Sequence, residues 1–222
     1  MQNEKQGNVE KELPPAMLIA GASALDFLNS IATPVDEVVE WIGNGADFLS
    51  WMNQAGLLDT SEITRIKRNL TARQLDCVAK EARALRNWFR RFAHKNMGHR
   101  IKKTVFDQLR PLNRLLGWDA VFWKIEPAEN KRSLTTVFRL RPQRHWRKPA
   151  SLLAPLAEEI AKFIASADFR RIKACEGEKC TLLFLDQSNQ LARRWCSMAV
   201  CGNRAKAATF AARFMSARKN GT

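Results

Sequence analysis

The feature that most constrains this chain is a group of four cysteines near its C-terminus. Cys175, Cys180, Cys196 and Cys201 follow the spacing C-x4-C-x15-C-x4-C. Zn²⁺ takes four ligands in a tetrahedron, and two close cysteine pairs joined by a longer loop are typical of such a site. Each pair supplies two thiolates from one turn, in which Gly177 can adopt a positive φ. We therefore predict one structural zinc ion held by these four cysteines.

Two other uses of the cysteines have to be weighed. Two disulfides are an alternative, but a reducing compartment disfavours them. A catalytic zinc site keeps an open position and uses His or a carboxylate, whereas four thiolates leave no vacancy. The fifth cysteine, Cys77, lies inside an expected helix, where we predict a small core residue.

Nothing in the sequence indicates export or a membrane span. The longest clean apolar stretch, Ala16 to Ala22, is far shorter than the roughly 18 residues of a spanning helix. The first twelve residues are polar and of mixed charge, unlike a secretory signal. We expect a soluble, cytoplasmic protein without a membrane partner.

Hydrophobic periodicity divides the chain into three parts: a disordered lead-in at 1–15, an α+β domain at 16–167 and a cysteine-containing unit at 168–222. Helices are expected at 23–31, 46–56, 71–94, 103–116 and 149–167. Thr71 and Gln74 form a capping-box pattern, and Pro111 should kink or split its helix. The aromatic and β-branched runs 118–125 and 133–141 predict a β-hairpin.

The cysteine-containing unit has its own pattern. A strand-like apolar run at 181–186 lies between the cysteine pairs, and residues 204–217 are expected to form a helix. Ala207, Phe210, Ala211 and Phe214 form the apolar side of that helix. This order resembles a treble-clef zinc finger. The fold class is therefore α+β: a mainly helical N-terminal domain with a β-hairpin, followed by a treble-clef-like finger.

Residues 175–206 also resemble the CGNR zinc-finger family. The matching words are Cys175, Cys180, Leu183-Phe-Leu-Asp186, Ser188, Arg193-Arg-Trp-Cys-Ser-Met198, and Cys201-Gly-Asn-Arg204 followed by Lys206. Two positions depart from the common pattern: Lys179 replaces an acidic residue, and Asn189 stands where the family often has Arg. The zinc ligands are unaffected, whereas a contact made by an arginine at position 189 would be missing.

The N-terminal part is similar to the ABATE-type domain of stress-induced transcription regulators. The matching words are Ala24-Leu-Asp-Phe-Leu-Asn-Ser30, Phe48-Leu-Ser-Trp51 and Gly56-Leu-Leu58. Together the two resemblances imply a bacterial DNA-binding protein with a role in transcription regulation and stress response. The N-terminal domain would then be a candidate sensor of a small ligand.

The net charge of +15 points to a polyanionic partner and is unevenly distributed. Residues 1–62 carry −8, residues 83–114 hold ten bases and one acid, and residues 168–222 carry +7, or about +5 with four thiolates and zinc. The bases at 83–114 could form a second phosphate-binding surface or a solvated helix face. The acidic head either packs on the basic part or faces away from the polyanion.

Four basic residues in the finger are the candidates for nucleic-acid contact: Arg193, Arg194, Arg204 and Lys206. They flank the ligands, where the metal fixes the backbone. Arg204 could instead hydrogen-bond within the finger or pair with Asp186. Phosphate contacts alone do not separate DNA from RNA, so RNA stays a third option.

No nucleotide-binding, nucleophile-elbow or metalloprotease motif is present, so we predict that the protein is not an enzyme. Asp26 and Asn29 are candidates for a ligand pocket in the N-terminal domain, with capping or core support as the alternative. A different class of function also fits: a protein-interaction or small-ligand-binding protein whose zinc finger is purely structural. Arg193 and Arg204 buried and satisfied within the fold would favour it.

Overall fold

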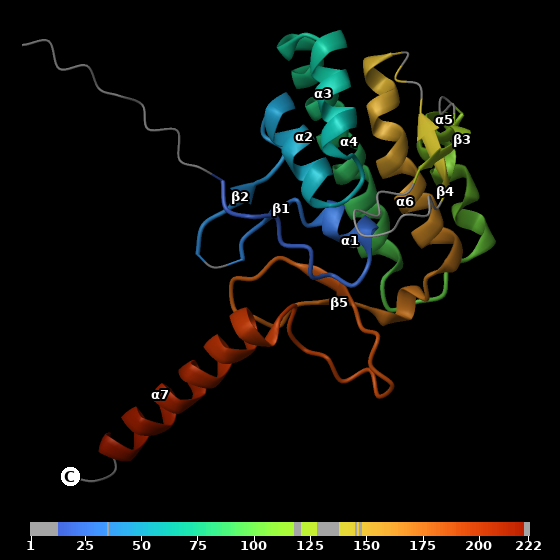
Figure 1. Ribbon diagram of the computed structural model, residues 1–222. Helices are drawn as coiled ribbons and strands as arrows, with labels where there is room; N and C mark the ends of the chain where they lie inside the picture. The colour runs from blue at the N-terminus through green and yellow to red at the C-terminus, as the bar shows by residue number, and fades with distance from the viewer. Residues whose placement is uncertain are drawn as a thin grey trace, which may run out of the picture.

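The computed structural model describes residues 13–34, 36–117, 121–127, 138–144, 146 and 148–219 (Figure 1). Of the expected lead-in, residues 1–12 lie outside the described part of the chain. Leu13–Pro15 lie against the body of the protein, because Trp41 Nε1 donates a hydrogen bond to the carbonyl of Pro14 at 2.8 Å. No helix among the described residues is both long and apolar enough to cross a membrane.

The N-terminal domain is mainly helical, as expected. Its helices are α1 Ser23–Leu28, α2 Gly45–Gln54, α3 Thr60–Asn69, α4 Ala72–Asn96, η1 Lys103–Leu109, α5 Arg110–Leu116, η2 Pro149–Leu153 and α6 Ala154–Ser166. Its strands are β1 Ile31–Ala32, β2 Val39–Glu40, β3 Val121–Pro127 and β4 Phe138–Arg144. Helix α3 was not predicted, because its sequence is mostly polar and Ile66 is its only buried residue.

Helix α4 is the central element of this domain. The predicted capping box is confirmed: the Thr71 hydroxyl accepts from the Gln74 amide, and the Gln74 side chain accepts from the Thr71 amide. The helix packs against α2, η2 and α1 and buries one apolar stripe: Leu75, Val78, Ala82, Leu85, Phe89 and Phe92. Helix α2 approaches closely because Gly45 lies against Leu75, where an added Cβ would come within 2.4 Å of the Leu75 Cβ. The prediction for Cys77 was wrong: this residue is exposed on the opposite face of α4.

Two further local predictions are confirmed. Pro111 splits its segment into the 3₁₀ helix η1 and helix α5, and it lies in the first turn of α5, where a missing amide hydrogen is tolerated. The hairpin is antiparallel, with Val121 opposite Arg144 and Pro127 opposite Phe138, so its second strand runs further than expected. Residues 118–120 and 128–137 of the expected hairpin lie outside the described part.

The finger follows α6 and comprises η3 Phe169–Arg171, β5 Ile172–Ala174, β6 Leu183–Leu185, the π-helical turn η4 Met198–Gly202 and helix α7 Asn203–Lys219. β5 and β6 pair antiparallel, with Lys173 opposite Phe184. The finger shares one core with the helical domain, because the ring of Phe169 lies 6.0 Å from Phe92 and 5.4 Å from Phe163.

Helix α7 leaves this body and extends away from it (Figure 1). Every side chain from Lys206 to Ala212 is exposed, and Phe210 is 73% exposed. The predicted apolar side of this helix therefore faces solvent at Ala207, Phe210 and Ala211, while the side chain of Phe214 is outside the described part.

Candidate metal centre and the surrounding finger

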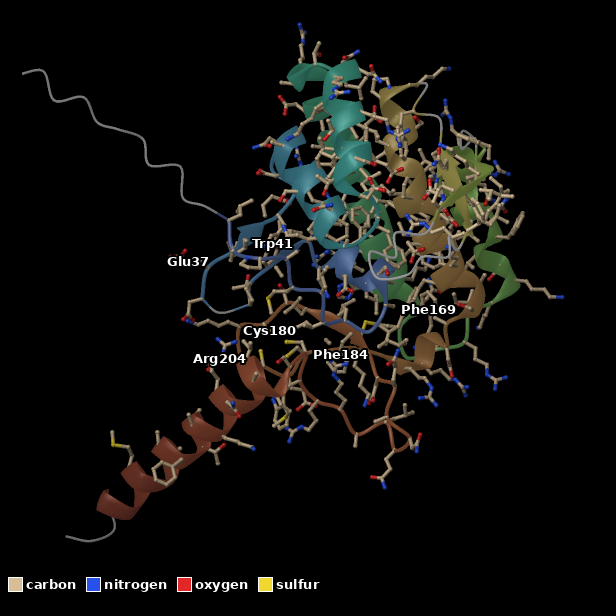
Figure 2. The ribbon with its side chains drawn as sticks, viewed as in Figure 1. Glu37, Trp41, Phe169, Cys180, Phe184 and Arg204 are labelled. Carbon is tan, nitrogen blue, oxygen red and sulfur yellow. The ribbon has the colours of Figure 1, made fainter. Side chains whose placement is uncertain are left out.

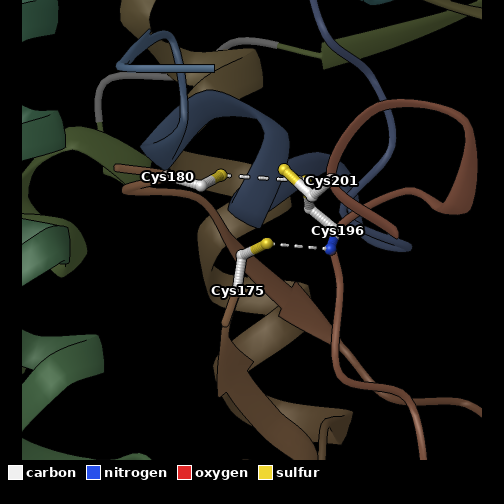
Figure 3. Close-up of side chains that lie close together, drawn as sticks. All are labelled: Cys175, Cys180, Cys196 and Cys201. Atoms are coloured by element: carbon white, nitrogen blue, oxygen red, sulfur yellow. Dashed lines mark hydrogen bonds between the residues drawn. The ribbon is translucent and has the colours of Figure 1, made fainter. Parts of the chain in front are cut away.

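The four cysteines predicted as ligands come together at one point of the finger (Figure 3). Cys175 directly follows β5 and Cys180 ends the next turn, whereas Cys196 precedes η4 and Cys201 lies within it. All four sulfur atoms lie within 4.8 Å of one another. The Sγ atoms of Cys180 and Cys196 are 3.8 Å apart, and those of Cys196 and Cys201 are 3.6 Å apart.

These distances fit zinc. A tetrahedron with metal–sulfur distances of about 2.3 Å has sulfur–sulfur edges of about 3.8 Å. Three of the four cysteines are buried and Cys180 is half-buried, so the site is closed to solvent on most sides. With four thiolates there is no open coordination position for substrate. The centre therefore holds one structural zinc ion, which fixes two turns and the start of α7.

The turn between the first two ligands requires a glycine, but for a different reason than predicted. Gly177 does not have a positive φ. A Cβ at this position would instead lie 3.0 Å from the Sγ of Cys201 and 3.2 Å from the Cβ of Cys180. The first cysteine turn thus passes so close to the last ligand that any side chain at position 177 would push against Cys180 and Cys201.

Donors from the surrounding chain face the sulfur atoms. The amides of Gly177 and Cys196 donate to the Sγ of Cys175 at 3.4 and 3.3 Å, and the Arg204 guanidinium donates to the Sγ of Cys201 at 3.3 Å. Such donors stabilise thiolate charge. A hydrogen bond from Cys196 lowers the pKa of the Cys180 thiol, which favours its thiolate form.

Asp186 organises the loop between the cysteine pairs, although its role was not predicted. It is fully buried and accepts hydrogen bonds from Lys173 Nζ at 2.8 Å, from the Ser188 hydroxyl at 2.6 Å and from the Arg193 amide at 3.0 Å. Burial raises the pKa of Asp186, but the bonds from Lys173 and Ser188 outweigh it and hold the pKa below its usual range. The carboxylate therefore stays ionised and ties the 186–193 loop to β5.

Two of the four predicted nucleic-acid residues turn toward the fold. Arg193 donates to the carbonyls of Trp195 at 3.0 Å and Ile19 at 3.1 Å, and its guanidinium lies 4.3 Å from the ring centroid of Phe184. Arg204 donates to the carbonyl of Pro34 at 2.6 Å (Figure 2). Each of these arginines therefore joins the finger to the segment around α1.

The other two predicted residues face solvent. Arg194 is exposed, pairs with Glu176 at 2.6 Å and lies 5.0 Å from the ring centroid of Trp195. Lys206 is exposed on the first turns of α7, and no ion pair forms between it and any described residue. The four candidates thus fall into two that position the finger and two that are open to a partner.

The two predicted pocket residues lie at the contact between α1 and the finger. Asn29 is 2% exposed, and its side-chain amide makes two hydrogen bonds to the main chain of Leu183. Its Nδ2 donates to the Leu183 carbonyl at 2.8 Å, and its Oδ1 accepts from the Leu183 backbone amide at 3.0 Å. Asp26 accepts from the amide of Ala20 at 2.8 Å, and burial raises its pKa. At these positions the side chains support the fold, while ligand binding by them stays a prediction.

The described part of the acidic head, from residue 13 onward, packs on the basic part through the segment 28–43, one of the two predicted arrangements. Arg86, with only 2% of its side chain exposed, donates to both carboxylate oxygens of Glu40 at 2.7 and 2.6 Å. Arg83 donates to the carbonyls of Ile42 and Gly43, and Arg90 to those of Leu28 and Ile31. In the sequence, this contact was indicated only by the opposite charges of residues 1–62 and residues 83–114. That difference does not identify the arginines that turn inward.

Comparison with known families agrees with this division of the chain. A family model described as "Putative stress-induced transcription regulator", named ABATE, matches residues 21–167, which is more than half of the chain. A second model, described as "CGNR zinc finger", matches residues 171–214 and includes all four clustered cysteines. No curated protein matches the chain.

Proposed function

The chain belongs to the ABATE family and carries a CGNR zinc finger, and from this we propose that it regulates transcription by binding duplex DNA through the finger. In this proposal residues 16–167 and 168–222 are the two functional units. The protein works in the reducing cytoplasm, where its thiolates remain available to zinc. In this proposal the finger acts by binding and not by metal catalysis, because the closed four-thiolate centre offers no coordination position for substrate.

One observation carries the proposal: α7 is a basic helix that is fixed at its start by a zinc ligand and whose side chains from Lys206 to Ala212 are all exposed. It spans Asn203–Lys219, contains five basic residues and no acidic one, and follows Cys201 almost directly. A helix is about 10–12 Å wide, which matches the width of the DNA major groove. The major groove of A-form RNA is too narrow for side-chain readout, so a protruding helix favours DNA over RNA.

The four basic residues divide between two roles in this proposal. Lys206 and Arg194 contact DNA, because both are exposed on the surface beside the metal centre. Arg193 and Arg204 are positioning residues, because their guanidinium groups already donate to main-chain carbonyls of the N-terminal domain. Binding of a small ligand to that domain would affect the finger through the same contacts, which include the bond between Asn29 and Leu183.

Binding of a fluorescently labelled duplex, measured by anisotropy at several salt concentrations, tests the proposal. The Arg194→Gln/Lys206→Gln variant should bind roughly 10-fold more weakly, and the slope of log K against log salt should become shallower by about 2. The matched control, Lys67→Gln/Arg68→Gln on α3, removes the same charge from exposed positions far from the finger. Equal losses in both variants, or wild-type binding that does not change with salt, would contradict it.

A second function is favoured by one observation. Arg193 and Arg204 donate to main-chain carbonyls within the fold, although Arg193 is only half-buried and Arg204 is exposed. Helix α7 also exposes the large apolar side chains of Phe210 and Met215, which are 73% and 65% exposed. Helices with such exposed anchors bind in apolar grooves of partner proteins. The finger would then be structural, with α7 as a protein-binding element. Wild-type protein that binds no duplex while retaining zinc would favour this function.

A further inference from the structure

The eight Lys and Arg residues from Arg83 to Lys103 form two sets with different surroundings. Three of them, Arg83, Arg86 and Arg90, point to the segment 28–43 and are hydrogen-bonded there. Five others lie on the outside of α4 and on the chain that follows it. We call these five the outer basic surface: Arg91, Lys95, Arg100, Lys102 and Lys103.

The charges of the outer basic surface are not compensated. All five side chains are exposed, and no ion pair forms between them and any residue in the described ranges. The one acid in this stretch, Asp107, pairs with Arg110 at 3.0 Å. Lys95 lies in the last turn of α4, where the helix dipole favours a positive charge. The dipole does not explain the three cations that lie beyond the helix, Arg100, Lys102 and Lys103.

The outer basic surface lies beside the finger. The Gly98 amide, in the loop that follows α4, donates to the carbonyl of Phe169 at 3.0 Å, and Phe169 begins the finger. In Figure 1 this green loop runs next to the orange turn, at the end of the molecule that also carries α7. Figure 2 places Phe169 and Arg204 on opposite sides of the finger. The two basic regions therefore flank one zinc-bound unit.

The surface also borders a hollow of about 360 Å³ between α4 and the segment formed by η1 and the start of α5. Its lining combines the polar side chains of Arg91, Lys95, Asp107 and Gln108 with the apolar ones of Trp88, Phe92 and Pro111. Two cations and an amide can donate hydrogen bonds there, and the carboxylate that also borders it, Asp107, is already paired. A backbone phosphate satisfies such donors, because phosphate contacts rely on charge and hydrogen bonding rather than on base identity.

We propose that the outer basic surface is a second DNA-contacting region, which binds backbone phosphates beside the segment contacted by α7. This inference rests on the proposed function of the finger. The partner is duplex DNA rather than an acidic protein or an anionic membrane, because this surface and the basic helix α7 flank the same zinc-bound unit. Its contacts set affinity and orientation and contribute no sequence preference.

The test compares three full-length proteins loaded with zinc: wild type, Arg91→Gln/Lys95→Gln/Arg100→Gln, and the control Arg65→Gln/Lys67→Gln/Arg68→Gln on α3. All six changed residues are exposed, and both variants lose three charges. Duplexes of several unrelated sequences are titrated at several salt concentrations. We expect the outer-surface variant to bind every duplex roughly 10- to 100-fold more weakly at physiological salt, with a slope shallower by about 3. The control should change far less.

Two other results would overturn this inference while leaving the finger's role intact. One is an outer-surface variant that binds like wild type or like the control, while Arg194→Gln/Lys206→Gln still loses affinity. The other is unchanged duplex binding combined with lost binding to phosphatidylserine vesicles or to polyglutamate, which would assign the surface to a membrane or an acidic protein. Wild type that binds no duplex would overturn both proposals at once.

Discussion

Replacing Cys196 with alanine is expected to reduce the zinc content from about one ion per chain to nearly zero and to unfold the finger. Cys196 is 1% exposed, and its sulfur lies within 3.8 Å of two other ligands. A structural zinc site provides roughly 10–16 kcal/mol of apparent binding free energy. The buried apolar side chains of the finger, such as Phe169, Leu183 and Phe184, belong to the core shared with the helical domain, whereas the two cysteine turns depend on the metal. Helix α7 should then lose its fixed orientation.

The chain provides a matched control for this experiment, because Cys77 is exposed and lies outside the cluster. Cys77→Ala should keep about one zinc ion and wild-type stability. Metal analysis after gel filtration gives the stoichiometry, and limited proteolysis between Cys175 and α7 reports folding of the finger. A Cys196→Ala protein that retains one zinc ion and a protease-resistant finger would show that the four thiolates do not form the site.

The second large effect is expected at the ion pair between α4 and β2. Glu40→Ala should lower the free energy of unfolding by about 3 kcal/mol, because it leaves the Arg86 guanidinium buried without its carboxylate. For a chain of this size that loss corresponds to a decrease in Tm of roughly 6–12 °C. The double variant Glu40→Ala/Arg86→Met should recover part of the loss, since it no longer buries a charge.

An exposed ion pair serves as the control for Glu40. Lys179 and Asp36 lie 3.1 Å apart with side chains 63% and 66% exposed. Asp36→Ala should therefore cost less than about 1 kcal/mol. Urea unfolding followed by circular dichroism measures all of these variants. Similar losses for Glu40→Ala and Asp36→Ala would show that burial of Arg86 does not make its ion pair important.

The metal centre could be predicted from sequence because its determinants are local. Two cysteine pairs with equal spacing place four thiolates in two turns, whatever the rest of the fold does. The capping box at Thr71 and the break at Pro111 are local in the same sense, and both are confirmed. Helix α3 was missed because it has few apolar residues, although its own capping box at Asp59 marks the start.

The directions of the arginine side chains could not be predicted, because their partners are distant in the sequence. Arg193 donates to Ile19 and Arg204 to Pro34, each across about 170 residues. Arg86 and Glu40 are also distant in the sequence, 46 residues apart. Basic residues counted along the sequence therefore overstate the surface available to a polyanion. Only the folded structure separates the cations that hold the acidic head from those that face solvent.

The central claim is that zinc fixes a finger whose protruding helix α7 binds duplex DNA. The most direct measurement is selection from a pool of random duplexes at physiological salt, with the zinc-loaded protein, after chelation, and after zinc is restored. The account predicts that duplexes are retained by the zinc-loaded protein, released on chelation and retained again with zinc. Equal retention of duplexes by the protein with and without zinc, or no retention by the zinc-loaded protein, would contradict the claim.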